Sequence, residues 1–113
     1  AESGRLIAVS TGSRNGAAGI GGRISQSAGT VTITGGTVEA TGSSAGAGIG
    51  GGSNANGGPV TITGGKVTAS GGDYGAGIGG GRDAPNTKVT INGGKVTAWG
   101  GNQAPGIGGG ANG

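Results

Sequence analysis

The sequence predicts an all-β fold: a β-solenoid (parallel β-helix) of about four 29-residue coils, with three short strands per coil. Three observations predict it: a constant repeat length, an alternation of apolar and polar residues, and Gly-Gly pairs between the alternating segments. The tetrapeptide Gly-Ile-Gly-Gly starts at Gly19, Gly48, Gly77 and Gly106, 29 residues apart each time. A second block, VTITGG or VTINGG, keeps the same period from Val31, Val60 and Val89.

The alternation within each repeat has period 2, which is the signature of a β-strand. Val and Ile fall on one side and Thr on the other, and all three residue types favour strands. The Gly-Gly pairs permit sharp corners between strands. The pattern predicts strands at 31–34, 37–41, 60–63, 66–70, 89–92 and 95–99, and a further short segment such as 47–50 in each coil.

Stacked coils place equivalent residues in columns, because each strand pairs with its counterpart one coil away. The expected inner columns are Val31/Val60/Val89, Ile33/Ile62/Ile91, Val9/Val38/Val67/Val96, Thr11/Ala40/Ala69/Ala98 and Ile20/Ile49/Ile78/Ile107. The chain then forms a single domain, 1–113, with coils at approximately 1–26, 27–55, 56–84 and 85–113. A bundle of polyproline-II helices is the alternative fold, but it leaves the VTIT alternation unexplained.

The composition agrees with a thin core rather than a conventional globular one. Glycine supplies 35 of the 113 residues, and the sequence has no Phe, Met, His or Cys. Such glycine content is typical of disorder or of collagen, yet disorder lacks patterned Val and Ile, and collagen needs Gly at every third position. No apolar run approaches the roughly 20 residues of a transmembrane helix, so we expect no membrane insertion.

Candidate chemistry is sparse. The acids are Glu2, Glu39, Asp73 and Asp83, and no two of them stack as a glycosidase pair or recur as calcium ligands in each coil. The Gly46–Gly51 stretch satisfies GxGxxG, but no helix is expected after it, so corner packing explains the glycines better. We therefore expect no catalytic, cofactor-binding or metal-ligating residues, no cofactor, and no enzyme activity.

The net charge of +3 comes from scattered basic residues, so we expect no nucleic-acid partner.

Two groups of residues are candidates for surface contact. The threonines Thr32, Thr61 and Thr90 form an outward column that is similar to the Thr-x-Thr ranks of ice-binding solenoids, although Asn92 interrupts the neighbouring column. An exposed strand threonine needs no such function, however. Trp99 has the outward parity of a strand residue, and Tyr74 is the other aromatic side chain. An exposed aromatic ring can stack against a sugar or another protein chain.

The stretches GGTVEATG and GAGIGGG together resemble the Gly/Thr-rich repeats of bacterial cell-surface proteins of the carbohydrate-binding β-helix type. The resemblance covers nearly the whole chain as a style of repeat, and it transfers no binding residue. It implies a β-helix fold and an extracellular, cell-surface, bacterial and non-catalytic setting.

Two functions are consistent with these observations. The first is an extracellular structural protein whose copies stack end to end into a filament, so that the partner is a second copy of the chain. Counted in a constant frame, Ala1 falls at the phase of Thr30 and Gly113 at that of Gln26, which leaves a three-residue gap between successive copies. The alternative is a cell-surface module with carbohydrate as its partner, or less favoured, with ice. The outer surface consists mostly of Gly, Thr and Ser, which favours the structural role.

Overall fold

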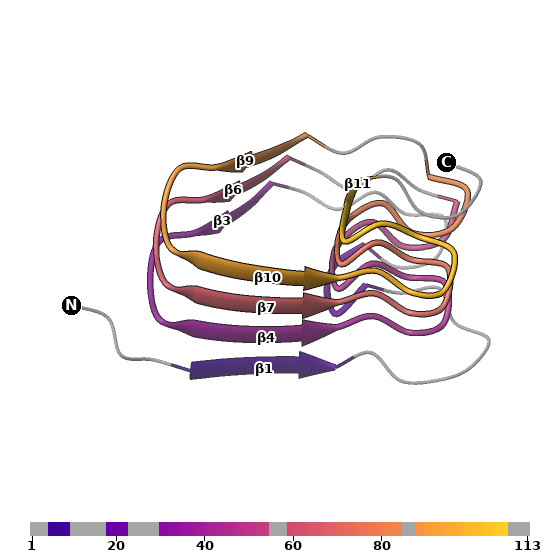
Figure 1. Cartoon of the computed structure of the whole chain (residues 1–113), viewed down its shortest axis with the longest axis horizontal. Coiled ribbons are helices and arrows are strands. Elements are labelled where there is room, and N and C mark those ends of the chain that lie inside the picture. The colour runs from indigo at the N-terminus through magenta and orange to yellow at the C-terminus, as the bar shows by residue number, and fades with distance from the viewer. Residues whose placement is uncertain (1–4, 10–17, 23–29, 55–58, 85–87, 109–113) are drawn as a thin grey trace.

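The protein is a parallel β-solenoid, as the sequence predicts (Figure 1). The computed structural model describes residues 5–9, 18–22, 30–54, 59–84 and 88–108. Within these ranges there are eleven strands and no helix. Successive coils lie on one another in Figure 1, and from β3 onward each coil turns through three short strands.

The strands have nearly identical lengths from coil to coil. The first coil contributes β1 (Arg5–Val9) and β2 (Ile20–Gly21). The next three coils contribute β3 (Val31–Ile33), β4 (Thr37–Thr41), β5 (Ile49–Gly50), β6 (Val60–Ile62), β7 (Lys66–Ser70), β8 (Ile78–Gly79), β9 (Val89–Ile91), β10 (Lys95–Trp99) and β11 (Ile107–Gly108). The strands predicted at 31–34, 60–63 and 89–92 are each one residue shorter than predicted, and those predicted at 37–41, 66–70 and 95–99 have the predicted bounds.

Three parallel sheets run along the stack, in the orders β1-β4-β7-β10, β2-β5-β8-β11 and β3-β6-β9. From β3 onward, each residue pairs with the residue 29 positions later, as in Ile33 with Ile62 and Ile62 with Ile91. In these coils, the distance in sequence between paired residues therefore equals the repeat length of 29 residues. The hydrophobic columns of the sequence become ladders of identical or similar side chains.

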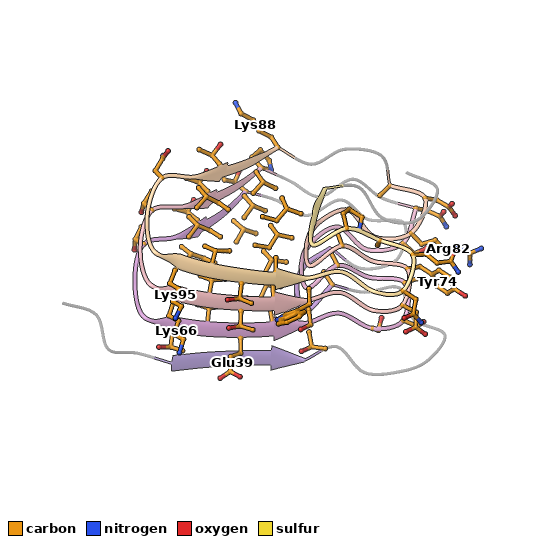
Figure 2. All side chains as sticks on the ribbon, in the orientation of Figure 1. Glu39, Lys66, Tyr74, Arg82, Lys88 and Lys95 are labelled. Atoms are coloured by element: carbon orange, nitrogen blue, oxygen red, sulfur yellow. The ribbon has the colours of Figure 1, made fainter. Side chains whose placement is uncertain are left out.

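The core lies between the three sheets (Figure 2). Each of its columns receives one side chain from each coil. Its fully buried large side chains are Val60, Ile62, Val67, Ile49 and Ile78, all in the two middle coils. Ile33, Val38, Ala40 and Ala69 complete the buried cluster, and Ile20, Val31, Val89, Val96 and Ala98 pack against it with partial exposure. Small β-branched side chains and alanine suffice because the sheets enclose a narrow space.

Glycine is required where adjacent coils approach most closely. Gly50, Gly79 and Gly108 form one column with φ between +133° and +142°, a region that side-chain-bearing residues rarely adopt. A Cβ on Gly50 would overlap the carbonyl oxygen of Gly79, and a Cβ on Gly79 would overlap that of Gly108. Backbone conformation and coil spacing therefore both explain why Gly follows Ile in every repeat.

The first coil corrects one prediction. The constant 29-residue frame placed Val9 against Val38 and Thr11 against Ala40, but β1 pairs with β4 through Leu6 and Val38, and through Ala8 and Ala40. Thr11 lies outside the described residues. The frame returns at Ile20, which pairs with Ile49, so the segment between β1 and β2 is three residues longer than its counterpart. The Leu-x-Ala spacing of β1 matches the inward Val-x-Ala of β4, and this match sets the register.

Candidate functional site

The last coil leaves the end of the stack uncovered. Ile91 is 40% exposed and Ile107 is 47% exposed, whereas their counterparts one coil earlier, Ile62 and Ile78, are fully buried. These two residues were predicted as members of the inner columns, and the structure keeps them in register with those columns. They are exposed because no described coil lies beyond β9–β11. We call the surface formed by Ile91, Val96, Trp99, Ile107 and Gly108 the stack end.

The backbone of the stack end is also incomplete. Along the second sheet, the N–H groups of Ile20, Ile49 and Ile78 donate to the carbonyls of Gly48, Gly77 and Gly106, with N···O distances of 2.8–2.9 Å. The equivalent N–H group of Ile107 has no such carbonyl partner among the described residues. A strand edge with unpaired groups of this kind is a template for pairing with another chain.

Gly108 distinguishes the stack end from the interior. Its φ of +142° matches that of Gly79, at +141°. Among the described residues, however, a Cβ on Gly108 would contact only the Pro105 ring, with the nearest atom at 3.2 Å. No described coil therefore lies against Gly108 in the direction in which Gly79 approaches the next coil.

The opposite end of the stack carries matching strands. β1 and β2 are the first strands of their sheets, and β10 and β11 are the last. β1 and β10 have five residues each, and β2 and β11 have two each, with the sequence Ile-Gly in both. The two ends therefore present edges of equal length and parallel direction in two of the three sheets.

Trp99 lies on the rim of the stack end. It is 61% exposed and ends β10, in the outward column that contains Ser70 and Thr41. The sequence placed it outward by strand parity. A large exposed ring beside an uncovered core is a feature of surfaces that bind a sugar or another protein.

The three candidate threonines stack in one column. Thr32 pairs with Thr61, and Thr61 pairs with Thr90, on the outer side of β3, β6 and β9. Thr32 is exposed, and the other two are half-buried. The next outward residues, Thr34 and Thr63, are exposed, and Asn92 interrupts that second column in the last coil.

Tyr74 belongs to a different surface, at the corner after β7 (Figure 2). The Arg82 guanidinium lies over its ring, with 5.1 Å between Cζ and the ring centroid, and Arg82 Nε is 3.8 Å from Asp83 Oδ2. Sequence reasoning missed this cluster, because its members lie on two loops whose sequences differ between repeats. Tyr74 and Trp99 are not brought together.

The described residues contain no group of three His, Cys, Asp or Glu side chains placed to hold a metal ion. They also contain no helix with the length and apolarity needed to cross a membrane. The strongest geometric feature in the described ranges is the stack end.

Comparison with known proteins agrees with the architecture. A family model described as "Beta helix repeat" matches residues 31–53, 60–82 and 89–111, which together make up more than half of the chain. Each match begins at the first strand of a coil and extends past the third. No curated protein and no solved structure matched the chain. The three tandem matches and the stacked parallel sheets show that the chain belongs to the beta helix repeat family.

Proposed function

We propose that this β-helix protein is an extracellular, non-catalytic structural protein whose copies stack end to end into a filament. The observation that carries the proposal is the stack end, where Ile91 and Ile107 are about half exposed and the strand edges continue the ladders of the interior. The extracellular, cell-surface setting rests on the resemblance of the glycine- and threonine-rich repeats to those of bacterial surface proteins.

A second copy fits the stack end by continuing the pairing already present. β10 has the sequence Lys-Val-Thr-Ala-Trp, and its first four residues repeat those of β7, which accepts a parallel strand in register. If β1 of the next copy pairs there, its Leu6 lies in register with Val96 and its Ala8 with Ala98, just as they pair with Val38 and Ala40 of β4.

The second sheet continues in the same way. β2 of the next copy would place its Ile20 on Ile107 and its Gly21 on Gly108, which repeats the Ile-on-Ile and Gly-on-Gly pairs of the interior. Full burial of an isoleucine side chain is worth about 1.5–3 kcal/mol, and stacking of Ile20 on Ile107 recovers the part that is lost at Ile107. Such a head-to-tail contact does not close on itself, so it produces an open filament.

The register of β1 changes the junction that the constant frame implied. β1 pairs with β4 from Arg5 with Thr37, which is three positions away from the pairing that the constant frame predicts. Among the described strands, the junction then joins two of the three sheets. The proposal therefore rests on β10 with β1 and on β11 with β2.

Gly108→Ala tests the proposal directly. A Cβ at this position meets little within its own chain, but in a stack it would overlap the carbonyl of Gly21 from the next copy, as a Cβ on Gly79 overlaps Gly108. We expect the wild-type protein to form filaments in negative-stain microscopy and concentration-dependent polymers in sedimentation velocity. We expect Gly108→Ala to need at least tenfold more protein for the same degree of assembly.

Thr63→Ala is the matched control, because Thr63 is exposed on an outer face in a middle coil. It should assemble as the wild type does, and circular dichroism should show that both variants keep the wild-type spectrum. A wild-type protein that remains a monodisperse monomer at high concentration contradicts the proposal. Unchanged assembly of Gly108→Ala contradicts the proposed junction.

A carbohydrate-binding module is the second candidate, and the exposed ring of Trp99 favours it. Trp99 belongs to the same outward column as Ser70 and Thr41, which carry hydroxyl groups. An aromatic ring with hydroxyl groups in the same column is suited to stacking on a sugar. Because Trp99 is the single tryptophan in the sequence, its fluorescence reports on this surface alone. A polysaccharide that shifts the emission of the wild-type protein supports this candidate, and the absence of a shift across a polysaccharide panel counts against it.

A further inference from the structure

Two lysines stack directly on one another on the outer surface. Lys66 and Lys95 are the first residues of β7 and β10 and pair in register, and both are exposed (Figure 2). The same column continues to Thr37 in β4 and Arg5 in β1. We call Arg5, Thr37, Lys66 and Lys95 the basic column. Neither lysine forms an ion pair within the described part of the chain.

This arrangement is electrostatically unfavourable on its own. Neighbouring strands lie about 4.8 Å apart, and like charges that face each other across strands are destabilising. Lys66 has an acidic diagonal neighbour, because Glu39 lies two residues beyond its partner Thr37. The corresponding neighbour of Lys95 is Thr68, which carries no charge. The positive charge is therefore least compensated at the stack end.

Stacking makes this imbalance larger. In the proposed junction, Arg5 of the next copy takes the register position that follows Lys95, since β1 pairs from Arg5 and β10 from Lys95. Three basic residues then follow one another, Lys66, Lys95 and Arg5, whereas Thr37 separates Arg5 from Lys66 within one chain. The junction thus holds the longest run of basic residues along the basic column, with Glu39 as a diagonal neighbour of Arg5 as it is of Lys66.

We propose that an extended polyanion binds along the basic column across the junction and thereby promotes stacking. This inference rests on the proposed end-to-end assembly. A flexible chain of phosphate groups can accept hydrogen bonds from the ammonium groups of Lys66 and Lys95, and the register places a third basic residue, Arg5, at the next position of the column. One polyanion that bridges two copies also increases their effective concentration, which free monovalent anions do not.

Inorganic polyphosphate is the probe, and sodium chloride of matched ionic strength separates binding from screening. We expect sodium chloride to favour assembly modestly, because it screens the repulsion. We expect polyphosphate to lower the protein concentration needed for assembly by roughly a further tenfold, which corresponds to about 1.4 kcal/mol. Sedimentation velocity measures both effects on the full chain.

Lys95→Gln and Lys88→Gln form a matched pair of variants. Both remove one positive charge from an exposed side chain, but Lys88 precedes β9 and lies away from the basic column (Figure 2). We expect Lys95→Gln to assemble more readily than the wild type without additives and to lose most of its response to polyphosphate. Lys88→Gln should keep the wild-type response.

Three outcomes overturn the inference and can be told apart. Equal effects of polyphosphate and matched sodium chloride mean that only screening acts. Equal loss of response in Lys95→Gln and Lys88→Gln means that net charge acts rather than the basic column. If the wild type forms no polymer under any condition, the stacking proposal itself is wrong, and the junction site is wrong with it.

Discussion

Gly79 and Gly108 hold equivalent places in successive coils and have nearly the same φ, yet in the described part of the chain only Gly79 has another coil against it. The first property is local, because a positive φ excludes most side chains wherever the residue lies. The second is a property of the stack, because it depends on the carbonyl of the coil beyond. Comparing the two glycines therefore separates the effect of the positive φ from the effect of close contact with the next coil.

We expect Gly79→Ala to destabilise the monomer more than Gly108→Ala does. Both substitutions place alanine at a strained φ, at a cost of about 1–3 kcal/mol. Gly79→Ala adds an overlap with the backbone of Gly108, and overpacking of this kind typically costs a further 1–3 kcal/mol. Chemical denaturation at low protein concentration measures the difference. Equal free energies of unfolding for the two variants would show that conformational strain alone selects glycine here.

At the scale of the strand, each isoleucine column gains its burial from neighbours on both sides. Ile49 and Ile78 are fully buried between adjacent coils, while Ile107 at the end of the same column is 47% exposed. The same residue type in the same local sequence thus contributes differently according to its place in the ladder. Burial in this fold is set by the number of adjoining coils.

We expect Ile78→Ala to cost about 2–5 kcal/mol of unfolding free energy, the usual range for a large-to-small change in a packed core. Ile107→Ala should cost the monomer less than half as much, because much of that side chain already contacts water. Under assembling conditions the difference should narrow, since stacking would bury Ile107. Thermal unfolding of both variants, at low and high protein concentration, measures this. A difference that does not depend on concentration would contradict burial of Ile107 by a second copy.

The strands and their registers were predictable where residues repeat, and less so where they do not. The spacing of Ile20 to Ile107 and the alternation of VTIT determine the pairing of nine strands from β3 onward, and the outward parity of Trp99 follows from it. The register of β1 was mispredicted, because a constant frame was assumed across a longer first segment. The Leu-x-Ala spacing of Leu6 and Ala8, which matches the Val-x-Ala of β4, was the available signal. The contact of Tyr74 with Arg82 was not predictable, because it depends on how two nonrepeating corners lie in space.

At the scale of the whole molecule, the stack is asymmetric. The core is completely buried in the coils of β6–β8, nearly so in those of β3–β5, and open at β9–β11. In a quasi-one-dimensional protein, each coil contacts only its neighbours, so stability is a sum of coil and interface contributions. The last described coil has one interface where the middle coils have two. It should therefore open at a lower free energy than they do.

Hydrogen exchange tests this gradient and the assembly together. In the monomer, we expect the amides of β7 and β8 to exchange slowest and those of β10 and β11 to exchange faster. Opening of an end coil breaks one interface, whereas opening of a middle coil breaks two.

In the assembled protein, protection from exchange should rise at β10 and β11 and at β1 and β2, and change little at β7. The β9 edge should gain less than β10, because the junction continues two of the three sheets. Mass spectrometry of peptides from both states reads these segments separately. Equal protection of β7 and β10 in the monomer would contradict the gradient, and a rise confined to the C-terminal strands would contradict head-to-tail stacking, because that contact must protect both ends.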